Sequence, residues 1–590
     1  MRHYFLTAIF LMSLLSCKEQ IEKDEQNFTT TYEKSDGNET ATYQETIDFY
    51  LRLAKAFPEV NVQTIGSTDS GKPLHLVTFN PDGNFNFQKI REDKTVLFIN
   101  NGIHPGEPDG IDAAMLLFRD LALNKLPVPK NVVLATIPVY NIGGMENRNS
   151  TTRVNQNGPN SYGFRGNARN YDLNRDFVKM DTENARTFTT IFHLVKPDVF
   201  IDTHVSNGAD YQYTLTHLFT QHNKLGGALG RYLNESFVPA LDRRLAAANW
   251  DTTPYVNVFN SPPDNGFSQF MDHPRYSTGY TTLWGTLGMM IETHMLKPHK
   301  KRVMGTYELI KEMLAIVDED HQQIKELRSK YKEDTLAMEH YPRHWAIDTT
   351  ATTPFLFKGY AVDTVISPVT GLPRLKYDRT RPFEKTIPFS NNYIAKDTLR
   401  VPSAYVIRKG WQKIIDRLIA NEIAFFALEK DTIATLEQYH ITDYQTYQQA
   451  YEGHYPHYNT KVTAATATIH LQKGDYIVPT AQEGIRYLLE TLEPEAVDSF
   501  FNWNFFDTIL QQKEGISPYV FEDIALQLLQ ENPKLQELFE QQKLDDPEFA
   551  AKALAQLQWI YEHSKYLEAA YLHYPVYRIK RGSKAEFLLK

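Results

Sequence analysis

Cysteine is almost missing from this chain of 590 residues, in which Cys17 is the single example. One cysteine excludes a disulfide within the chain. An excess of positive charge is missing as well, since 62 Lys and Arg residues stand against 72 Asp and Glu residues and leave a net charge of −10. Binding to a phosphate backbone requires a basic face, so this balance argues against nucleic acid, and against other anionic polymers, as the partner.

Internal repeats and low-complexity tracts are absent too, so ordinary packed domains have to fill the length. One hydrophobic core does not grow to this size, and a hydrophobic content of 42% supports several packed units. We predict two domains and a short appendage. The division is a signal in residues 1–17, a polar and disordered tether in 18–42, a first domain in 43–333 and a second domain in 334–590.

The N-terminus has the pattern of an export signal. Arg2 supplies positive charge, and residues 5–15 form an apolar stretch that is too short to span a bilayer. The ending at Cys17 resembles a bacterial lipobox, which implies cleavage before Cys17, a lipid on its thiol, and an exported lipoprotein of the outer membrane, facing the periplasm or the cell surface. A plain secretory signal with an incidental cysteine is the alternative. The acidic bias of residues 18–25 resembles surface-export signals, and a solvated linker explains it equally well.

Helix-like and strand-like stretches alternate through the first domain, which indicates an α/β fold with a mixed sheet and helices on both faces. The stretches are residues 45–55, 74–79, 95–100, 111–123, 131–140, 182–194, 198–204 and 287–293. Residues 301–332 carry apolar side chains at three- and four-residue spacing, so we expect one long amphipathic helix to close the domain.

The second domain is predicted to be α+β and offers no residues whose chemistry we can assign. Short β-like runs fill residues 341–402, a helix and a strand fill 411–428, strands fill 462–478, and helices fill 481–492, 520–530 and 549–571. Trp503, Phe505 and Phe506 suit stacking on sugars or a substrate wall, although packing in a core is the more common role of such side chains.

A histidine and a carboxylate at H-x-x-E spacing, His104 and Glu107, follow the apolar strand of residues 95–100. Imidazole nitrogen and carboxylate oxygen are ordinary zinc ligands, and a catalytic zinc needs a third protein ligand beside an open position. His204 ends another apolar strand and is the expected third ligand. An H-x-x-E pair alone is more often a solvated turn, so the rest of the chain has to decide.

Two further motifs complete a pattern. A D-x-N-R motif begins at Asp172, and Glu292 ends a third apolar strand after His204. In this order, the H-x-x-E, D-x-N-R, strand-His and strand-Glu motifs resemble the M14 metallocarboxypeptidase family over residues 43–315. The resemblance implies a zinc-dependent metallopeptidase that hydrolyses peptide amide bonds, with one Zn²⁺ per chain and carboxypeptidase action next to a free carboxylate.

The resemblance also assigns roles around the metal. Asp172 is expected to accept the free ring N–H of the first zinc histidine and so to fix its tautomer, with a turn aspartate as the alternative. Asn174 and Arg175 are expected to hold the C-terminal carboxylate of the substrate, for which the planar fork of arginine is suited. An ion pair of Arg175 with Asp176 or Asp172 is the structural alternative.

Arg165 matches the family's arginine that stabilises the oxyanion, with Arg153 and Arg169 as nearby competitors for this role. Glu292 is the expected general base, which takes a proton from the attacking water and passes it to the leaving amine. The apolar strand around Glu292 favours a raised pKa, and an ion pair with Lys297 is the alternative role.

A mobile tyrosine upstream of the base is common in the family, but the local sequence departs from the pattern of the digestive enzymes. Tyr276 and Tyr280 are both candidates for contact with the substrate, and packing is the more usual role for one of 34 tyrosines. Arg275 either binds an acidic substrate group or forms a surface ion pair.

Two other functions stay open. Relatives with the same residues act as peptidoglycan-stem or gamma-glutamyl amidases or endopeptidases. A catalytically degenerate surface lipoprotein that binds peptides is the alternative from another class, although no ligand and no base is missing from the motifs. The expected partners are a peptide or peptidoglycan-stem substrate and a membrane that holds the N-terminal lipid.

Overall fold

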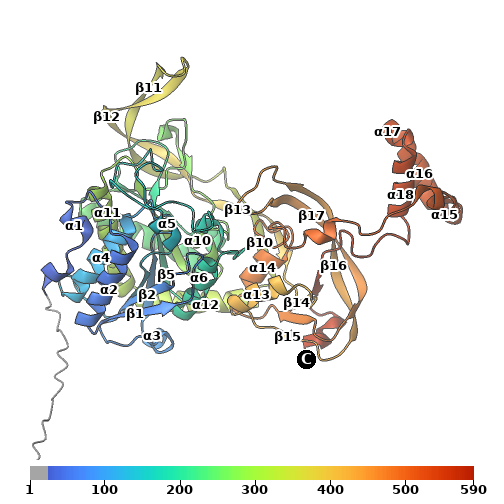
Figure 1. Ribbon diagram of the computed structural model, residues 1–590, viewed down its shortest axis with the longest axis horizontal. Helices are drawn as coiled ribbons and strands as arrows, with labels where there is room; N and C mark the ends of the chain where they lie inside the picture. Colours follow the sequence, from blue (N-terminus) through green and yellow to red (C-terminus); the bar gives the residue numbers. More distant parts are fainter. Residues whose placement is uncertain (1–23, 590) are drawn as a thin grey trace, which may run out of the picture.

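The computed structural model describes residues 24–589 of the chain (Figure 1). The predicted signal and Cys17, the predicted site of lipid attachment, lie outside the described residues, so attachment to a membrane stays a prediction. Within residues 24–589, no helix combines the length and the apolar character that a membrane span requires.

An eight-stranded mixed sheet forms the centre of the first domain, in the order β1-β2-β4-β3-β5-β9-β6-β7. The four inner strands, β4, β3, β5 and β9, run parallel, and antiparallel neighbours flank them on both sides. Every residue of β3 and β4 is buried, which explains why both strands are continuous apolar runs in the sequence. The strands are β1 Val60–Ile65, β2 Leu74–Phe79, β3 Thr95–Asn100, β4 Val132–Ile137, β5 Val199–Ser206, β6 Leu215–Phe219, β7 Thr252–Pro254 and β9 Leu287–His294.

Helices lie on both faces of this sheet, so the predicted α/β fold is confirmed (Figure 1). One face carries α2 Tyr43–Ala56, α4 Asp109–Ala122 and α11 His299–Glu319, and the other carries α6 Glu183–Val195 and α10 Ser277–Thr282. Phe188 of α6 contacts Phe98 of β3 and Phe200 of β5. The shorter helices are η1 Glu25–Phe28, α1 Thr31–Lys34, α3 Phe87–Asp93, α5 Ile142–Glu146, η2 Leu173–Arg175, α7 His222–Leu225, α8 Gly227–Tyr232 and α9 Val238–Ala247.

The single long helix expected over residues 301–332 is in fact two helices. α11 ends at Glu319 and α12 spans His321–Ala337, with Asp320 outside the helical conformation at φ −94° and ψ 11°. The Asp320 carboxylate accepts a hydrogen bond from the Tyr232 hydroxyl at 2.6 Å. Residues 318–323 are all polar, so the apolar spacing is interrupted where the helix breaks.

Residues 24–42 pack against the first domain, so the expected disordered tether is wrong for this part of the chain. Phe28 is fully buried and meets the ring of Phe49 edge to face. Arg119 donates a hydrogen bond to the Glu33 carboxylate at 2.7 Å. A few aromatic and charged contacts thus order a segment whose average composition is polar.

The second domain has the predicted α+β content and lies beside the first domain (Figure 1). Its main sheet has six strands in the order β15-β18-β14-β19-β16-β17, and β10 pairs with β13 in a separate sheet. The elements are β10 His340–Ile347, β13 Tyr393–Arg400, β14 Ala404–Ile407, α13 Gln412–Ala420, β15 Phe426–Ala427, β16 Thr432–Thr446, β17 His457–Leu471, β18 Tyr476–Pro479, α14 Ile485–Leu492 and β19 Val576–Ile579.

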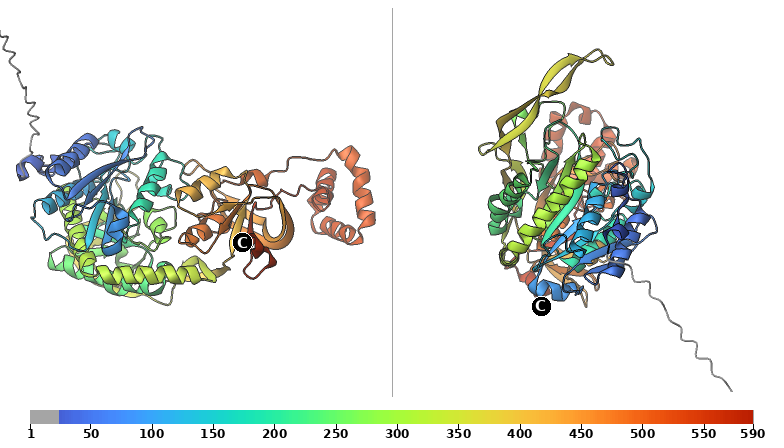
Figure 2. Two further views of the ribbon diagram at one scale, coloured as in Figure 1. Left: turned by 90° about the horizontal axis from the view of Figure 1, so that it is seen from below. Right: turned by 90° about the vertical axis from the view of Figure 1, so that its left-hand side faces the viewer.

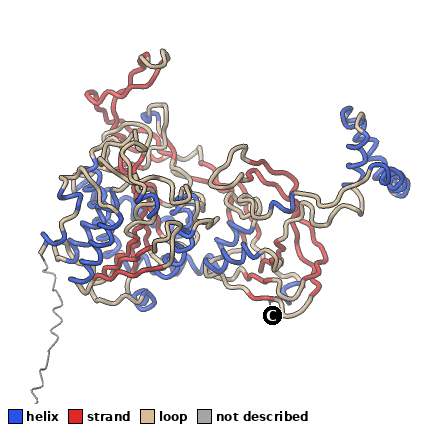
Figure 3. The backbone as a smooth tube through the Cα atoms, viewed as in Figure 1, coloured by secondary structure: helices blue, strands red, loops and turns tan. Residues whose placement is uncertain are grey.

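Two parts project from the body of the molecule. The hairpin of β11 Thr353–Ile366 and β12 Pro373–Ser390 pairs with β8 Phe267–Ser268, so it is attached to the first domain although it follows residue 333 (Figure 2). A helical bundle extends from the second domain on two loops (Figure 3). Its helices are α15 Pro518–Glu531, α16 Pro533–Asp545, α17 Pro547–Ala550 and α18 Ala553–Glu562, so the helix expected over 549–571 is broken and ends early.

Candidate active site

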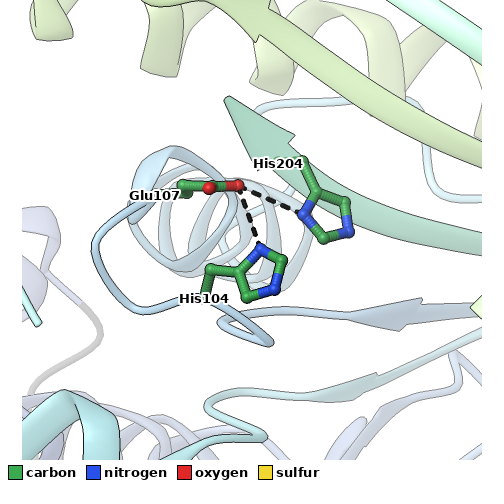
Figure 4. A group of neighbouring side chains, drawn as sticks. All are labelled: His104, Glu107 and His204. Atoms are coloured by element: carbon green, nitrogen blue, oxygen red, sulfur yellow. Dashed lines mark hydrogen bonds and ion pairs between the residues drawn. The ribbon is translucent and has the colours of Figure 1, made fainter. Parts of the chain in front are cut away.

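Three side chains from two parallel strands form a candidate metal centre. His104 and Glu107 lie in the turn after β3, and His204 lies on the neighbouring strand β5. One ligand atom from each of the three lies within 4.8 Å of the others (Figure 4). The Glu107 Oε2 atom is 3.1 Å from His204 Nδ1 and 3.5 Å from His104 Nδ1. The structure therefore brings together the three ligands that the sequence predicts.

The donor set fits zinc. All three side chains are buried, and His104 Nδ1 has no hydrogen-bond partner although it is shielded from water. A buried polar atom without a partner costs free energy, and a metal ion removes that cost. Two imidazole nitrogens with a carboxylate are a common ligand set of catalytic zinc, which leaves a position open for water.

Each histidine is held by a carboxylate on its outer nitrogen. His104 Nε2 lies 2.9 Å from Asp172 Oδ1, as the sequence predicts, and His204 Nε2 lies 2.9 Å from Asp202 Oδ2. Such contacts fix the tautomer that presents Nδ1 to a metal and raise the basicity of the ring. The sequence analysis missed Asp202, although its D-x-H spacing was a usable signal because residues two apart on a strand share a face.

We expect Asp202→Asn to weaken zinc binding by about 10- to 100-fold, because the uncharged amide no longer stabilises the tautomer and basicity of His204. Competition with a chelating dye measures the change. Asp242→Asn is the matched control, since Asp242 pairs with His217 at 3.3 Å in the same way but away from the metal centre. Equal zinc affinity of Asp202→Asn and the control contradicts a role for Asp202.

Glu292 lies opposite His204 in the register of β9 and β5 and lines the same cavity as the metal centre. Removal from water raises the pKa of the Glu292 carboxyl to about 7, and the negative charge of Glu107 acts in the same direction. His204 and Arg165 oppose the shift. A carboxylate with a pKa near neutrality is suited to exchange protons with water and amines.

Two arginines reach the metal centre and a third does not. Arg165 donates from Nε to Asp172 at 3.0 Å, and its Nη1 lies 3.5 Å from Glu107. Arg153 is closer to Glu107, at 2.6 Å from Nη1 to Oε1. Arg169 instead donates to a backbone carbonyl and lies outside the cavity lining, so it is not a competitor. Arg165 keeps a side chain that is 43% exposed, which leaves it room to turn towards a substrate.

The cavity beside the metal centre has a volume of about 440 Å³, and Asn174, Arg175 and Tyr276 line it. Arg175 lies over the ring of Tyr276, 4.6 Å from its centroid. Asn174 is fixed by a hydrogen bond from the Ser277 backbone N–H at 3.1 Å. The three predicted substrate contacts therefore line one cavity together with the predicted oxyanion arginine and general base.

Tyr280 lies outside this cavity lining, so the structure does not bring it together with the other predicted substrate contacts. Its side chain is fully buried, and its hydroxyl donates to Asn421 at 2.7 Å. Tyr276 precedes α10 and faces the cavity, whereas Tyr280 lies within that helix. Arg275 pairs with the buried Asp498 at 2.8 Å and is outside the cavity lining, which favours its structural role. Trp503 and Phe506 are buried and Phe505 packs against the core, so these rings form no sugar platform.

Comparison with known proteins finds one family and several curated proteins that are similar to this chain. The family described as zinc carboxypeptidase matches residues 46–193, a range that holds the H-x-x-E and D-x-N-R motifs but ends before His204 and Glu292. "Carboxypeptidase 2" of Trichophyton rubrum is 22% identical over 493 residues, which cover 79% of this chain and 84% of that protein. The protein of the same description from Trichophyton equinum is 22% identical over 502 residues, with the same coverage.

Solved structures with a partial likeness carry related descriptions. A metallo-carboxypeptidase from Burkholderia cenocepacia is 15% identical, with a TM-score of 0.35, and the match covers 47% of this chain and 69% of that one. Carboxypeptidase A from Helicoverpa armigera is also 15% identical, with a TM-score of 0.35, and the match covers 48% of this chain and 74% of that one. The family model therefore matches part of the first domain, and the curated relatives are similar to this chain over most of its length.

Proposed function

We propose that this chain, whose residues 46–193 match the zinc carboxypeptidase family M14, uses one bound zinc ion to remove C-terminal residues from peptides. The observation that carries this proposal is the sharing of a single cavity by the metal centre, the general base and a carboxylate-binding pair. The pair consists of Asn174 and Arg175. A site that only bound peptides has no need of a base such as Glu292 beside the metal.

The chemistry follows from the positions of these side chains. When bound, zinc lowers the pKa of a water molecule and polarises the carbonyl of the scissile amide. Glu292 takes a proton from the attacking water and passes it to the leaving amine. Arg165 donates hydrogen bonds to the oxygen that gains negative charge as the carbonyl becomes tetrahedral. His104 and His204 keep their tautomers through Asp172 and Asp202.

A free C-terminal carboxylate is the expected anchor of the substrate. The guanidinium of Arg175 lies over the ring of Tyr276, and the Arg175 side chain, which lines the cavity, is 22% exposed. A planar guanidinium makes two parallel hydrogen bonds to a carboxylate, and the amide of Asn174 adds a further donor. This arrangement favours attack on the last peptide bond rather than on an internal one.

Replacement of Arg175 by Met is expected to lower kcat/KM for peptides with a free C terminus by about 10- to 100-fold, because hydrogen bonds to charged groups contribute about 1.5–3 kcal/mol. Amidation of the substrate's C terminus should cost the wild-type protein a similar factor and cost the variant much less. Mass spectrometry of residues released from matched free and amidated peptides measures both effects. Arg169→Met is the control, since Arg169 lies outside the cavity lining.

Other results point to other functions. Equal cleavage of free and amidated peptides contradicts carboxypeptidase action. Cleavage at D-residues of peptidoglycan stems, or of gamma-glutamyl bonds, identifies the amidase alternative. Absence of both bound zinc and cleavage leaves the peptide-binding lipoprotein as the better hypothesis.

A further inference from the structure

A turn of the second domain contacts the first domain next to the metal centre. Residues 447–456 join the long strands β16 and β17, and the turn Tyr451-Glu452-Gly453-His454 lies within this connection. Tyr451 and His454 exchange backbone hydrogen bonds at 2.8 and 3.1 Å. Glu452 and Gly453 have φ angles of 50° and 79°. Positive φ at both central residues is the pattern of a type I′ turn, which is unusual for a glutamate.

The turn fits closely against the D-x-N-R segment. A Cβ atom on Gly453 would lie 2.6 Å from the hydroxyl of Tyr171, so only glycine allows this approach. His454 Nε2 lies 2.7 Å from the carboxylate of Asp181. Asp181 also pairs with the fully buried Lys179 at 3.0 Å, which ties the turn to a charged network inside the first domain.

Glu452 connects this turn to the metal centre. Its carboxylate accepts a hydrogen bond from the backbone N–H of Asp172 at 2.8 Å. The Asp172 side chain in turn contacts His104 Nε2 at 2.9 Å and Arg165 Nε at 3.0 Å. Two hydrogen bonds therefore lead from the second domain to a predicted zinc ligand. Glu452 adopts a conformation that few non-glycine residues adopt, and such conformations concentrate at functional sites.

A second contact between the domains lies beside Tyr276, which lines the cavity. Asp498 is fully buried in the second domain and accepts hydrogen bonds from the backbone and side chain of Arg275, both at 2.8 Å. Arg275 also lies over the ring of Trp503 at 5.0 Å. The next residue is Tyr276, on which Arg175 stacks. The second domain thus contacts Asp172 through Glu452 and the residue before Tyr276 through Asp498.

We propose that the second domain contributes a positioning residue, Glu452, to the candidate active site. Glu452 holds Asp172 in place for its contact with His104, and it also holds the segment that carries Asn174 and Arg175. The proposal rests on the proposed function for its catalytic consequence but not for its effect on zinc. It gives the second domain a role that its sequence does not suggest. Loss of the Glu452 acceptor should loosen the D-x-N-R segment without unfolding either domain.

The test compares zinc affinity and peptide hydrolysis in full-length variants. Glu452→Ala removes the acceptor, and we expect about tenfold weaker zinc binding by chelator competition, because one hydrogen bond to a carboxylate is lost and the effect reaches the ligand through Asp172. KM for peptides with a free C terminus should rise through Arg175. Glu452→Gln keeps an acceptor oxygen in place and should restore most of the affinity.

Gly453→Ala is the second variant, because its added Cβ displaces the turn from Tyr171 while Glu452 remains. It should reproduce the loss of zinc affinity. Gln448→Ala is the matched control, since Gln448 is exposed in the same connection and donates only within the hairpin, to Thr446. Thermal unfolding of each variant separates loosening of the site from loss of the fold.

The outcomes are distinct. Wild-type zinc affinity and KM in both Glu452→Ala and Gly453→Ala overturn the proposal. Equal losses in Glu452→Ala and Glu452→Gln also contradict it, because the amide oxygen should replace the carboxylate as acceptor. If the wild-type protein binds zinc but cleaves no peptide, the proposed function fails, whereas the zinc affinities of the variants still test the role of Glu452.

Discussion

Replacement of Glu292 by Gln is expected to leave zinc bound and to lower kcat by roughly 10²- to 10⁴-fold, the range that general acid–base catalysis contributes. Gln keeps the size of the side chain and its place opposite His204, but it cannot accept the proton of the attacking water. Zinc content by elemental analysis and steady-state kinetics on one peptide measure the two effects. Glu522→Gln is a suitable control, because Glu522 is exposed on α15 in the projecting bundle.

The pH profile of the wild-type protein provides a second measurement on the same residue. Only the ionised carboxylate of Glu292 can take up a proton, so kcat/KM should fall as the pH drops below the pKa of this group. Burial raises that pKa to about 7 in the chain without metal, and the positive charge of a bound metal lowers it from there. The acid limb should therefore lie at or below neutral pH. Wild-type turnover in Glu292→Gln would falsify the assignment.

Arg165→Gln is expected to lower kcat by roughly 10²- to 10³-fold, with a smaller change in KM, because a fixed donor to the developing oxyanion acts mainly in the transition state. Arg165 lines the cavity, and its exposed side chain is held by a hydrogen bond to Asp172 and an ion pair with Glu107. Steady-state kinetics under saturating zinc separates kcat from KM and from loss of metal.

Arg153 provides the sharpest comparison. Its Nη1 atom lies 2.6 Å from Glu107 Oε1, so Arg153→Gln should act mainly by changing how Glu107 binds the metal. Arg169→Gln should change neither kcat nor zinc binding, because Arg169 lies outside the cavity lining. If kcat falls greatly in Arg153→Gln at full zinc occupancy and little in Arg165→Gln, Arg153 rather than Arg165 is the donor to the oxyanion.

The parts of the fold that the sequence predicted well are those in which one local pattern has one structural solution. The bounds of β2 and β3 are reproduced exactly by the predicted ranges 74–79 and 95–100. Strands buried on both faces require continuous apolar runs, which stand out in the sequence. Parallel strands β3, β5 and β9 place the residues at their carboxyl ends along the same edge of the sheet. This rule was sufficient to predict that His104, His204 and Glu292 lie close together.

Local patterns failed where a tertiary contact decided the outcome. Tyr276 and Tyr280 are four residues apart and similar in the sequence, yet only Tyr276 lines the cavity. Phe28 is buried in the core of the first domain, and this packing orders residues 24–42 despite their polar composition. The hairpin of β11 and β12 returns to the first domain because β12 pairs with β8, a contact that no linear division into domains predicts.

The sequence by itself predicted the candidate site residues, because residue type and the strands that carry them point to the two histidines and Glu292, and the order of the family's motifs points to the arginines. The tertiary structure alone decided what supports that chemistry. Glu452 reaches Asp172 from 280 positions along the chain, and Asp498 reaches Arg275 from 223 positions. Such contacts depend on how whole domains pack, since a hydrogen bond is specified by the distance between two atoms and not by their separation in sequence.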